Sequence, residues 1–205
     1  MSQVTTGLRR ILSVPFVYDW LQKLVGAYAG RKDILERHVR VETGQRVLDI
    51  GCGTGFALAH MPPVDYIGLD LNQNYVRQAR ARYGERGIFR CRDINTEKFD
   101  DAEKFDVALA FGLLHHLNDG EVKVLFEKVG SVLRLGGRLV TLDPCVMDGQ
   151  SLLAKTMIGF DRGQHIRTVP EYRYLAESVF PHVRVHLKYD LLRFKYAHII
   201  MECWA

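Results

Sequence analysis

The chain has 205 residues, of which 47% are hydrophobic and 25% are charged. This length and composition fit one folded domain with a substantial core, which excludes disordered, collagen-like and low-complexity classes. The 28 lysine and arginine residues exceed the 24 aspartate and glutamate residues by four. So small an excess permits a nucleic acid or an anionic membrane as a partner but does not require one.

The cysteines and the apolar runs indicate the cellular compartment. The four cysteines stand far apart, with no Cys-x-x-Cys pair and no histidine at zinc-ligand spacing, so we interpret them as reduced packing residues and expect no metal. Pro15, Asp19 and Lys23 interrupt the apolar core that a signal peptide would need. No run approaches the roughly 20 apolar residues of a membrane span. We therefore expect a cytoplasmic protein without a membrane partner.

The predicted elements begin with two helices. Apolar residues recur at helical spacing over residues 16–28, and a second helix is expected over 32–41, so that residues 1–42 form an N-terminal helical cap. A short strand over 46–50 then ends in the glycine loop 51–55, and residues 56–61 look helical. This stretch therefore has the order strand, glycine loop, helix.

Strands and helices continue to alternate after the loop. We expect strands over 64–71, 87–91, 105–111 and 138–143, a helix over 73–83, and helices opened by capping boxes at Asn118 with Glu121 and at Thr168 with Glu171. Residues 146–167 lack periodicity and read as a loop or lid insertion. A late strand near 183–187 and a final hairpin partner over 197–203 complete a mostly parallel α/β sheet with helices on both faces.

The informative polar residues follow the ends of the predicted strands. Asp49 and the glycines end the first strand, Asp70 ends the second, Asp93 follows the third, and Phe111 ends the fourth. Ligands bind at this edge of an open parallel sheet. Asp70 comes 19 positions after Gly51, the reach of a carboxylate that accepts hydrogen bonds from a ribose. The pattern therefore predicts a ligand that contains a nucleoside.

Five segments carry a resemblance to one known family. Residues 47–55 read Val-Leu-Asp-Ile-Gly-Cys-Gly-Thr-Gly, and the other segments are 66–70, 92–94, 105–117 and 133–140. Together they resemble the motifs of the class I S-adenosylmethionine-dependent methyltransferases, in the small-molecule branch. The resemblance implies a Rossmann-like fold of seven strands with an antiparallel last strand. It also implies S-adenosylmethionine as the cofactor and S-adenosylhomocysteine as the product.

The resemblance also implies roles for particular residues. The loop from Gly51 through Cys52 to Gly53 should pass the methionine part of the cofactor, and Asp49 should help to position it. Asp70 should hold the ribose. The remaining contacts expected for the cofactor are Leu71 and Ile94 at the adenine, Asp93 at its amine, Phe111 at the methionyl chain, and Tyr18 at the carboxylate. Tyr18 is equally well explained as a core residue of its helix.

The acceptor is expected to be a small molecule methylated on oxygen or nitrogen. His115 or His116 could act as a general base, although such a pair is also common without a catalytic role. Asp161, His165 and Arg167 are candidate acceptor-binding residues because they fall in the irregular segment, although a solvated loop explains them too.

We expect no nucleic-acid acceptor. The Asn/Asp-Pro-Pro-aromatic tetrapeptide of enzymes that methylate nucleobases is absent, because residues 111–114 read Phe-Gly-Leu-Leu. The arginines spread over residues 77–92 are interpreted as a solvated helix face. The oligomeric state is left open by the sequence.

Two rival functions remain. A nicotinamide-dependent oxidoreductase would also have a strand, a glycine loop and a downstream acid, but its fingerprint is Gly-x-Gly-x-x-Gly, whereas this loop runs Gly51-x-Gly53-x-Gly55. A non-catalytic cofactor-binding subunit or regulator would keep the same motifs without turnover. Methyl transfer separates the main hypothesis from both.

Overall fold

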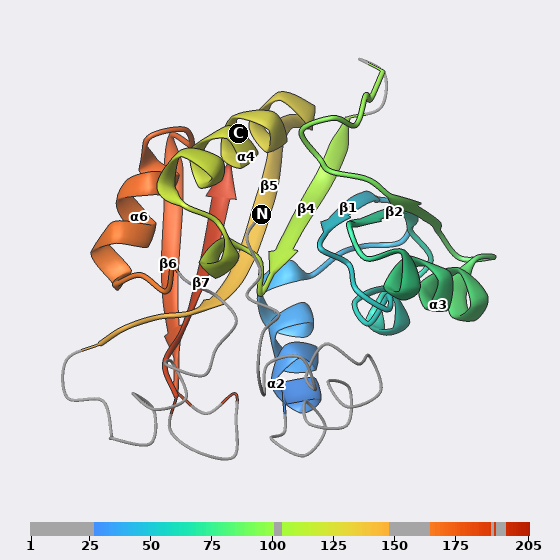
Figure 1. Ribbon diagram of the computed structural model, residues 1–205, viewed down its shortest axis with the longest axis horizontal. Coiled ribbons are helices and arrows are strands. Elements are labelled where there is room, and N and C mark those ends of the chain that lie inside the picture. The colour runs from blue at the N-terminus through green and yellow to red at the C-terminus, as the bar shows by residue number, and fades with distance from the viewer. Residues whose placement is uncertain (1–26, 101–103, 148–164, 190, 192–195) are drawn as a thin grey trace.

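The computed structural model describes residues 27–100, 104–147, 165–189, 191 and 196–205 (Figure 1). Tyr18, Asp161 and most of the helix expected over 16–28 lie outside the described residues. The helical elements are α2 (Ala27–Ile34), η2 (Leu35–Val39), η3 (Leu58–His60), α3 (Gln73–Tyr83), η4 (Leu114–His116), α4 (Asp119–Val132) and α6 (Val169–Glu177). The strands are β1 (Arg46–Ile50), β2 (Asp65–Asp70), β3 (Ile88–Cys91), β4 (Phe105–Phe111), β5 (Leu133–Pro144), β6 (His182–Lys188) and β7 (His198–Trp204).

The seven strands form one sheet in the order β3-β2-β1-β4-β5-β7-β6. Strands β1 to β5 pair in parallel, and β7 is antiparallel to both β5 and β6. The predicted α/β fold with an antiparallel last strand is therefore confirmed. The chain winds outward from β1 to β3 and then returns to β4, so the strand order reverses between β1 and β4. The carboxyl edge at such a reversal is where ligands bind in open α/β sheets.

Helices cover both faces of the sheet. Figure 1 shows α4 and α6 beside β5, β6 and β7, while α3 lies beside β1 and β2. Leu125 and Phe126 of α4 and Tyr172 of α6 belong to one buried apolar layer. Leu35 of η2 and Val76 of α3 belong to the layer on the opposite face. Burial on both faces explains why the central strands are continuously apolar rather than alternating.

Local sequence signals set the helix starts. The Asn118 side chain accepts a hydrogen bond from the Glu121 backbone N–H, and the Glu121 carboxylate accepts one from the Asn118 backbone N–H. Glu171 likewise accepts from the backbone N–H of Thr168 at 2.7 Å. Both predicted capping boxes are therefore confirmed. Among the described residues, no helix is long and apolar enough to span a membrane.

Three elements differ from the sequence-based expectation. The helix expected over 56–61 is reduced to the single 3₁₀ turn η3, because Pro62 and Pro63 follow directly and disfavour a continuing helix. The helix expected over 32–41 begins earlier, at Ala27, and ends as the π-helix η2. The strand expected from Arg138 already begins at Leu133, with an irregularity in its pairing to β4. The division into a cap and a lid stays a prediction.

Candidate functional site

The glycine loop after β1 needs its glycines for different reasons. Gly51, Gly53 and Gly55 have φ angles of 76°, 55° and 82°, in the left-handed region that disfavours side chains. A Cβ atom on Gly55 would also lie 2.9 Å from the ring of Tyr83. Among the described residues, no atom lies within 4 Å of a Cβ placed on Gly53. The loop therefore packs tightly at Gly55, whereas the described part of the chain leaves room beside Gly53.

The Asp70 carboxylate joins this loop to the end of β2. Its Oδ2 accepts a hydrogen bond from the Gly53 N–H at 2.9 Å, and its Oδ1 accepts one from the Asn72 N–H at 2.7 Å. Burial raises its pKa. The N–H groups of Gly51 and Cys52 both donate to the Leu69 carbonyl. The loop amides are thus engaged within the protein, and the sheet edge gains a fixed carboxylate beside the open space at Gly53.

Asp49 is a second carboxylate below the loop. It is buried in β1 and its Oδ2 accepts a hydrogen bond from the Tyr66 hydroxyl at 2.6 Å. Burial raises the pKa of Asp49 to about 6, against the lowering effect of the Tyr66 bond, while the charge of Asp70 raises the pKa further and Arg31 lowers it. The site therefore holds a carboxyl group whose ionised form is disfavoured by burial, and the Tyr66 hydrogen bond and the charge of Arg31 offset only part of this effect.

The remaining predicted cofactor contacts lie at the same edge. Leu71 follows β2 and is 48% exposed, so its side chain is accessible to a ligand at this edge. Asp93 follows β3 and accepts a hydrogen bond from the Asn95 N–H, while Ile94 is buried in the core. Phe111 ends β4. The structure thus brings Asp49, Asp70, Asp93 and Phe111 to neighbouring strand ends, as the strand order requires.

Cys52 has a packing role in this structure. Its side chain is buried in the apolar layer with Tyr66 and Phe89, and its Sγ would lie 2.9 Å from a Cβ placed on Gly68. Burial raises the pKa of the Cys52 thiol far above its ordinary value. The thiol is therefore held protonated against the sheet, and only the backbone of Cys52 belongs to the loop surface.

His115 forms a buried pair with Asp143. Its Nδ1 lies 2.7 Å from the Asp143 Oδ1, and its backbone N–H donates to the same oxygen at 3.2 Å. Burial raises the pKa of Asp143, although the contacts with His115 lower it. A carboxylate at Nδ1 places the imidazole proton on that nitrogen, so that Nε2 carries the lone pair. This arrangement can orient an imidazole as a proton acceptor.

Arg31 and His115 converge on the backbone of Gly112. A Cβ placed on Gly112 would lie 3.8 Å from both Arg31 Nη2 and His115 Cε1, and the φ angle of Gly112 is 66°. Sequence reasoning missed Arg31 and Asp143. Asp143 could have been found by the argument used for Asp70, because it too lies near the carboxyl end of a parallel strand. Arg31 offers no comparable signal, since its place depends on how α2 packs.

The predicted acceptor-binding residues have different surroundings. The His165 backbone N–H donates to the His115 carbonyl at 3.0 Å, which holds the two chain segments together. The His116 ring lies 4.1 Å from the His115 ring, between centroids. Arg167 is only 6% exposed, and its guanidinium donates to the Asp119 carboxylate and to the carbonyls of Leu114, His165 and Leu117. We therefore interpret Arg167 as a brace of the segment around η4.

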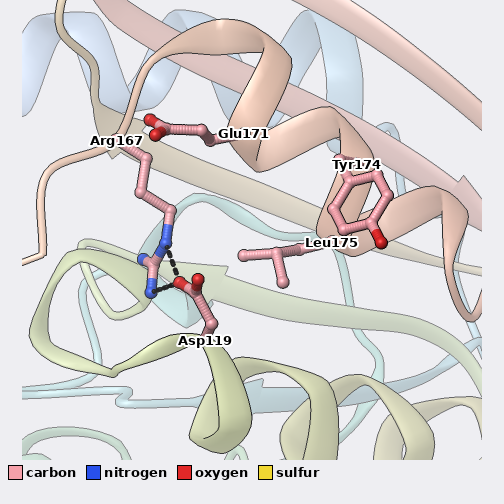
Figure 2. Close-up of a pocket in the computed structure, with 5 residues that line it drawn as sticks. All are labelled: Asp119, Arg167, Glu171, Tyr174 and Leu175. Atoms are coloured by element: carbon pink, nitrogen blue, oxygen red, sulfur yellow. Dashed lines mark hydrogen bonds and ion pairs between the residues drawn. The ribbon is translucent and has the colours of Figure 1, made fainter.

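A small cavity lies beside this brace. It has a volume of about 100 Å³ and is lined by Asp119, Arg167, Glu171, Tyr174 and Leu175. Figure 2 shows Arg167 bound to Asp119 across one side of it, with Tyr174 and Leu175 of α6 on the other. Sites for small molecules usually have about 300 to 1,000 Å³. The cavity is too small for a nucleoside-containing ligand.

Comparisons with known proteins agree with this layout. A family model described as "Methyltransferase domain" matches residues 47–137, which run from β1 into β5. The ubiquinone/menaquinone biosynthesis C-methyltransferase UbiE of Burkholderia multivorans is 29% identical over 201 residues, which cover 88% of this chain and 78% of that protein. Phosphoethanolamine N-methyltransferase 1 of Triticum aestivum is 27% identical over 159 residues, which cover 75% of this chain and 31% of that protein.

A solved structure extends the likeness to the fold. Phosphoethanolamine N-methyltransferase 2 of Haemonchus contortus, in complex with phosphomonomethylethanolamine and S-adenosylhomocysteine, superposes with a TM-score of 0.77 at 17% identity. The match covers 96% of this chain and 58% of that one. The arrangement of strands and helices is therefore shared with this protein.

Proposed function

We propose that the chain is a class I S-adenosylmethionine-dependent methyltransferase that methylates an oxygen or nitrogen atom of a small-molecule acceptor, as the match to a methyltransferase-domain model and the likeness to UbiE support. S-adenosylmethionine is the cofactor and S-adenosylhomocysteine the product. The observation that carries the proposed chemistry is the His115–Asp143 pair, because an acceptor hydroxyl or protonated amine must lose a proton when it is methylated.

The carboxyl edge around Gly53 is suited to this cofactor. S-adenosylmethionine carries a sulfonium cation and an ammonium group, and the buried Asp49 carboxylate and the partly buried Asp70 carboxylate both lie at the loop. In this proposal the open space at Gly53 receives the methionine part, Asp70 accepts from the ribose hydroxyls, and the exposed Leu71 covers the adenine. Arg31, which acts on Asp49 electrostatically, pairs with the cofactor's carboxylate.

The reaction is an in-line displacement. The acceptor atom supplies an electron pair to the methyl carbon, the sulfur–methyl bond breaks, and its electron pair stays on sulfur as the thioether of S-adenosylhomocysteine. His115 takes the acceptor's proton at Nε2, and Asp143 holds the imidazole in the tautomer that this requires. The protein's further contributions are alignment of the two reactants and exclusion of water.

A carbon acceptor is the second candidate. The relative UbiE is named a C-methyltransferase and aligns over 88% of this chain. The other named relative is an N-methyltransferase. A carbon nucleophile also needs its proton removed, so the same imidazole serves either chemistry.

The proposal is tested in two stages. Calorimetric titration with S-adenosylmethionine and S-adenosylhomocysteine should show binding, whereas NADH, as the control for the oxidoreductase alternative, should not bind. The protein is then incubated with ¹³C-methyl-labelled cofactor and a panel of phenols, amines, phosphoethanolamine and quinols. Formation of S-adenosylhomocysteine identifies the acceptor, and the methyl carbon shift in NMR assigns the methylated atom. Cofactor binding without turnover across the panel would favour the non-catalytic subunit instead.

A further inference from the structure

A second cluster of ionisable side chains lies on the face of the sheet that η2 covers. Glu202 of β7 is only 2% exposed. Its Oε1 lies 2.9 Å from Nδ1 of His38, in η2, and 3.3 Å from Nε2 of His186, in β6. The candidate ligand atoms of these three residues all lie within 4.8 Å of one another. Three separate elements thus present two imidazoles and one carboxylate to a common point.

We propose that His38, His186 and Glu202 bind one divalent metal ion of the zinc class. Two histidines and one glutamate form a known donor set for Zn²⁺. Bond lengths of roughly 2.0 to 2.2 Å in a tetrahedral arrangement separate neighbouring ligand atoms by about 3.4 Å. The observed separations of 2.9 and 3.3 Å between the imidazole nitrogens and Oε1 require only small movements to accept an ion.

The Glu202 carboxylate has an oxygen atom available for a metal beside the two imidazoles. Oε2 of Glu202 is buried and has no hydrogen-bond partner among the described residues. An unsatisfied buried carboxylate oxygen is costly, and coordination would supply the missing partner. His38 can move its proton to the other ring nitrogen, which frees Nδ1 for the ion.

Two arginines compete with the ion for Glu202. The Arg40 guanidinium lies 3.9 Å from Oε2 and is 59% exposed, so it can turn into solvent at little cost. Burial lowers the pKa of Arg138 and the charge of Glu202 raises it, while its Nη2 donates to the Val39 carbonyl. Both positive charges lower the affinity of Glu202 for a cation. Removal of the Arg40 charge should therefore strengthen metal binding.

The proposed metal site lies apart from the proposed cofactor site at the carboxyl edge, and a bound ion would stabilise the fold. Glu202 pairs with Val140, which pairs with Leu109, which pairs with Asp49. Glu202 therefore lies three strands away from Asp49, roughly 14 Å at the usual strand spacing. A bound ion would join the helix that precedes β1 to the two strands at the far edge of the sheet. His38 lies in a π-helix, a rare form that is frequent at functional sites.

The test uses the chain without a polyhistidine tag, after treatment with a chelator. Titration with Zn²⁺ is followed by calorimetry, and titration with Co²⁺ by visible absorption, whose intensity reports tetrahedral coordination. We expect one ion per chain and a higher unfolding temperature when the ion is bound. His38→Ala and His186→Ala should each weaken binding at least tenfold, and Arg40→Gln should strengthen it several-fold. His182→Ala, which removes an exposed histidine from the same strand, is the matched control.

The two histidine variants test metal binding without disrupting the core of the protein. His38 and His186 are only partly buried, so their alanine variants are expected to fold, which circular dichroism checks. Glu202→Gln is less suitable as a first variant because this residue is fully buried. The proposal is overturned if the wild-type chain binds no ion, or if His186→Ala binds Co²⁺ as tightly as the wild type. It is also overturned if His182→Ala weakens binding as much as His186→Ala.

Discussion

The Tyr66 hydroxyl donates a hydrogen bond of 2.6 Å to Oδ2 of Asp49, and this bond holds the buried carboxyl group below the glycine loop. The pKa of Asp49 is raised from its ordinary value of 3.8 to about 6, chiefly by burial. The ligand-free protein therefore carries an unfavourable buried charge above pH 6. As the pH falls below 6 the group takes up a proton, and the penalty declines until it is lost near pH 4.

Asp49→Asn should stabilise the ligand-free protein at high pH. At pH 8 the free energy of unfolding should rise by on the order of 2 to 3 kcal/mol, because the variant has no charge to bury. The advantage should shrink through pH 6 and vanish near pH 4, where the wild-type carboxyl is protonated. Urea unfolding at pH 8, 6 and 4 measures this. A variant that is less stable than the wild type at pH 8 would contradict the proposed burial penalty.

The same carboxyl should couple cofactor binding to protons. S-adenosylmethionine brings positive charge, which favours the ionised form of Asp49. Its affinity should therefore fall between pH 7.5 and pH 5, and binding near pH 6 should release protons. Calorimetry in two buffers with different ionisation enthalpies counts the protons released. Asp49→Asn should bind more weakly and lose the proton release, whereas an unchanged release would assign it to another group.

Asp70→Ala should weaken binding of S-adenosylhomocysteine by about 1.5 to 3 kcal/mol, which is roughly ten- to a hundredfold. Two losses contribute, because the carboxylate is proposed to bind the ribose and also holds the N–H groups of Gly53 and Asn72. Calorimetric titration gives the affinity. Asp65→Ala, at the opposite end of the same strand, is the control and should bind normally. Equal affinity in both variants would remove Asp70 from the cofactor site.

His115→Gln should lower turnover by roughly 10²-fold or more, the usual contribution of a general base, while the affinity for S-adenosylhomocysteine stays near the wild-type value. Asp143→Asn should lower kcat as well and shift its pH profile, because the imidazole loses its orienting carboxylate. The turnover rates are measured with the acceptor that the screen of phenols, amines, phosphoethanolamine and quinols identifies. His116→Gln, measured in parallel, decides between the two histidines. A larger loss in His116→Gln would assign the base role to that residue.

Arg167→Ala should destabilise the fold rather than alter acceptor recognition alone. The free energy of unfolding should fall by about 2 to 4 kcal/mol, because the carbonyls of Leu114 and Leu117 lose their donor in a buried place. Arg173→Ala is the matched control, since it breaks an exposed pair with Glu177 and should cost at most about 0.5 kcal/mol. Wild-type stability with an altered KM would instead support the original acceptor-binding interpretation of Arg167.

Local sequence patterns predicted most helices and strands and several of the residues at the carboxyl edge of the sheet. Asn118 with Glu121 marked a helix start because a capping box depends on residues three positions apart. The glycine loop and Asp70 were found because strand ends in a parallel sheet share one edge. The helix expected over 56–61 was too long. The apolar residues of this stretch are as compatible with a single turn as with a helix, and the two prolines that follow prevent the helix from continuing.

Contacts between distant segments could not be predicted in this way. His115 and Asp143 are 28 residues apart, and His38 and Glu202 are 164 residues apart. Their meeting depends on the strand order and on the angle at which α2 and η2 cross the sheet. Neither quantity leaves a periodic signal in the sequence. For the same reason, the hydrogen bonds of Arg167 could not be predicted, because they go to the backbone of a segment about 50 residues earlier in the sequence.

The position of β7 has a consequence for synthesis of the chain. This strand lies between β5 and β6 and pairs with seven residues of each, although both neighbours precede it in the sequence. Until residues 198–204 have left the ribosome, β5 and β6 each present an open edge towards the missing strand. The pairings of β7 with β5 and β6 are therefore the latest contacts of the sheet to form, and a chain that lacks residues 198–204 would leave two strand edges unpaired.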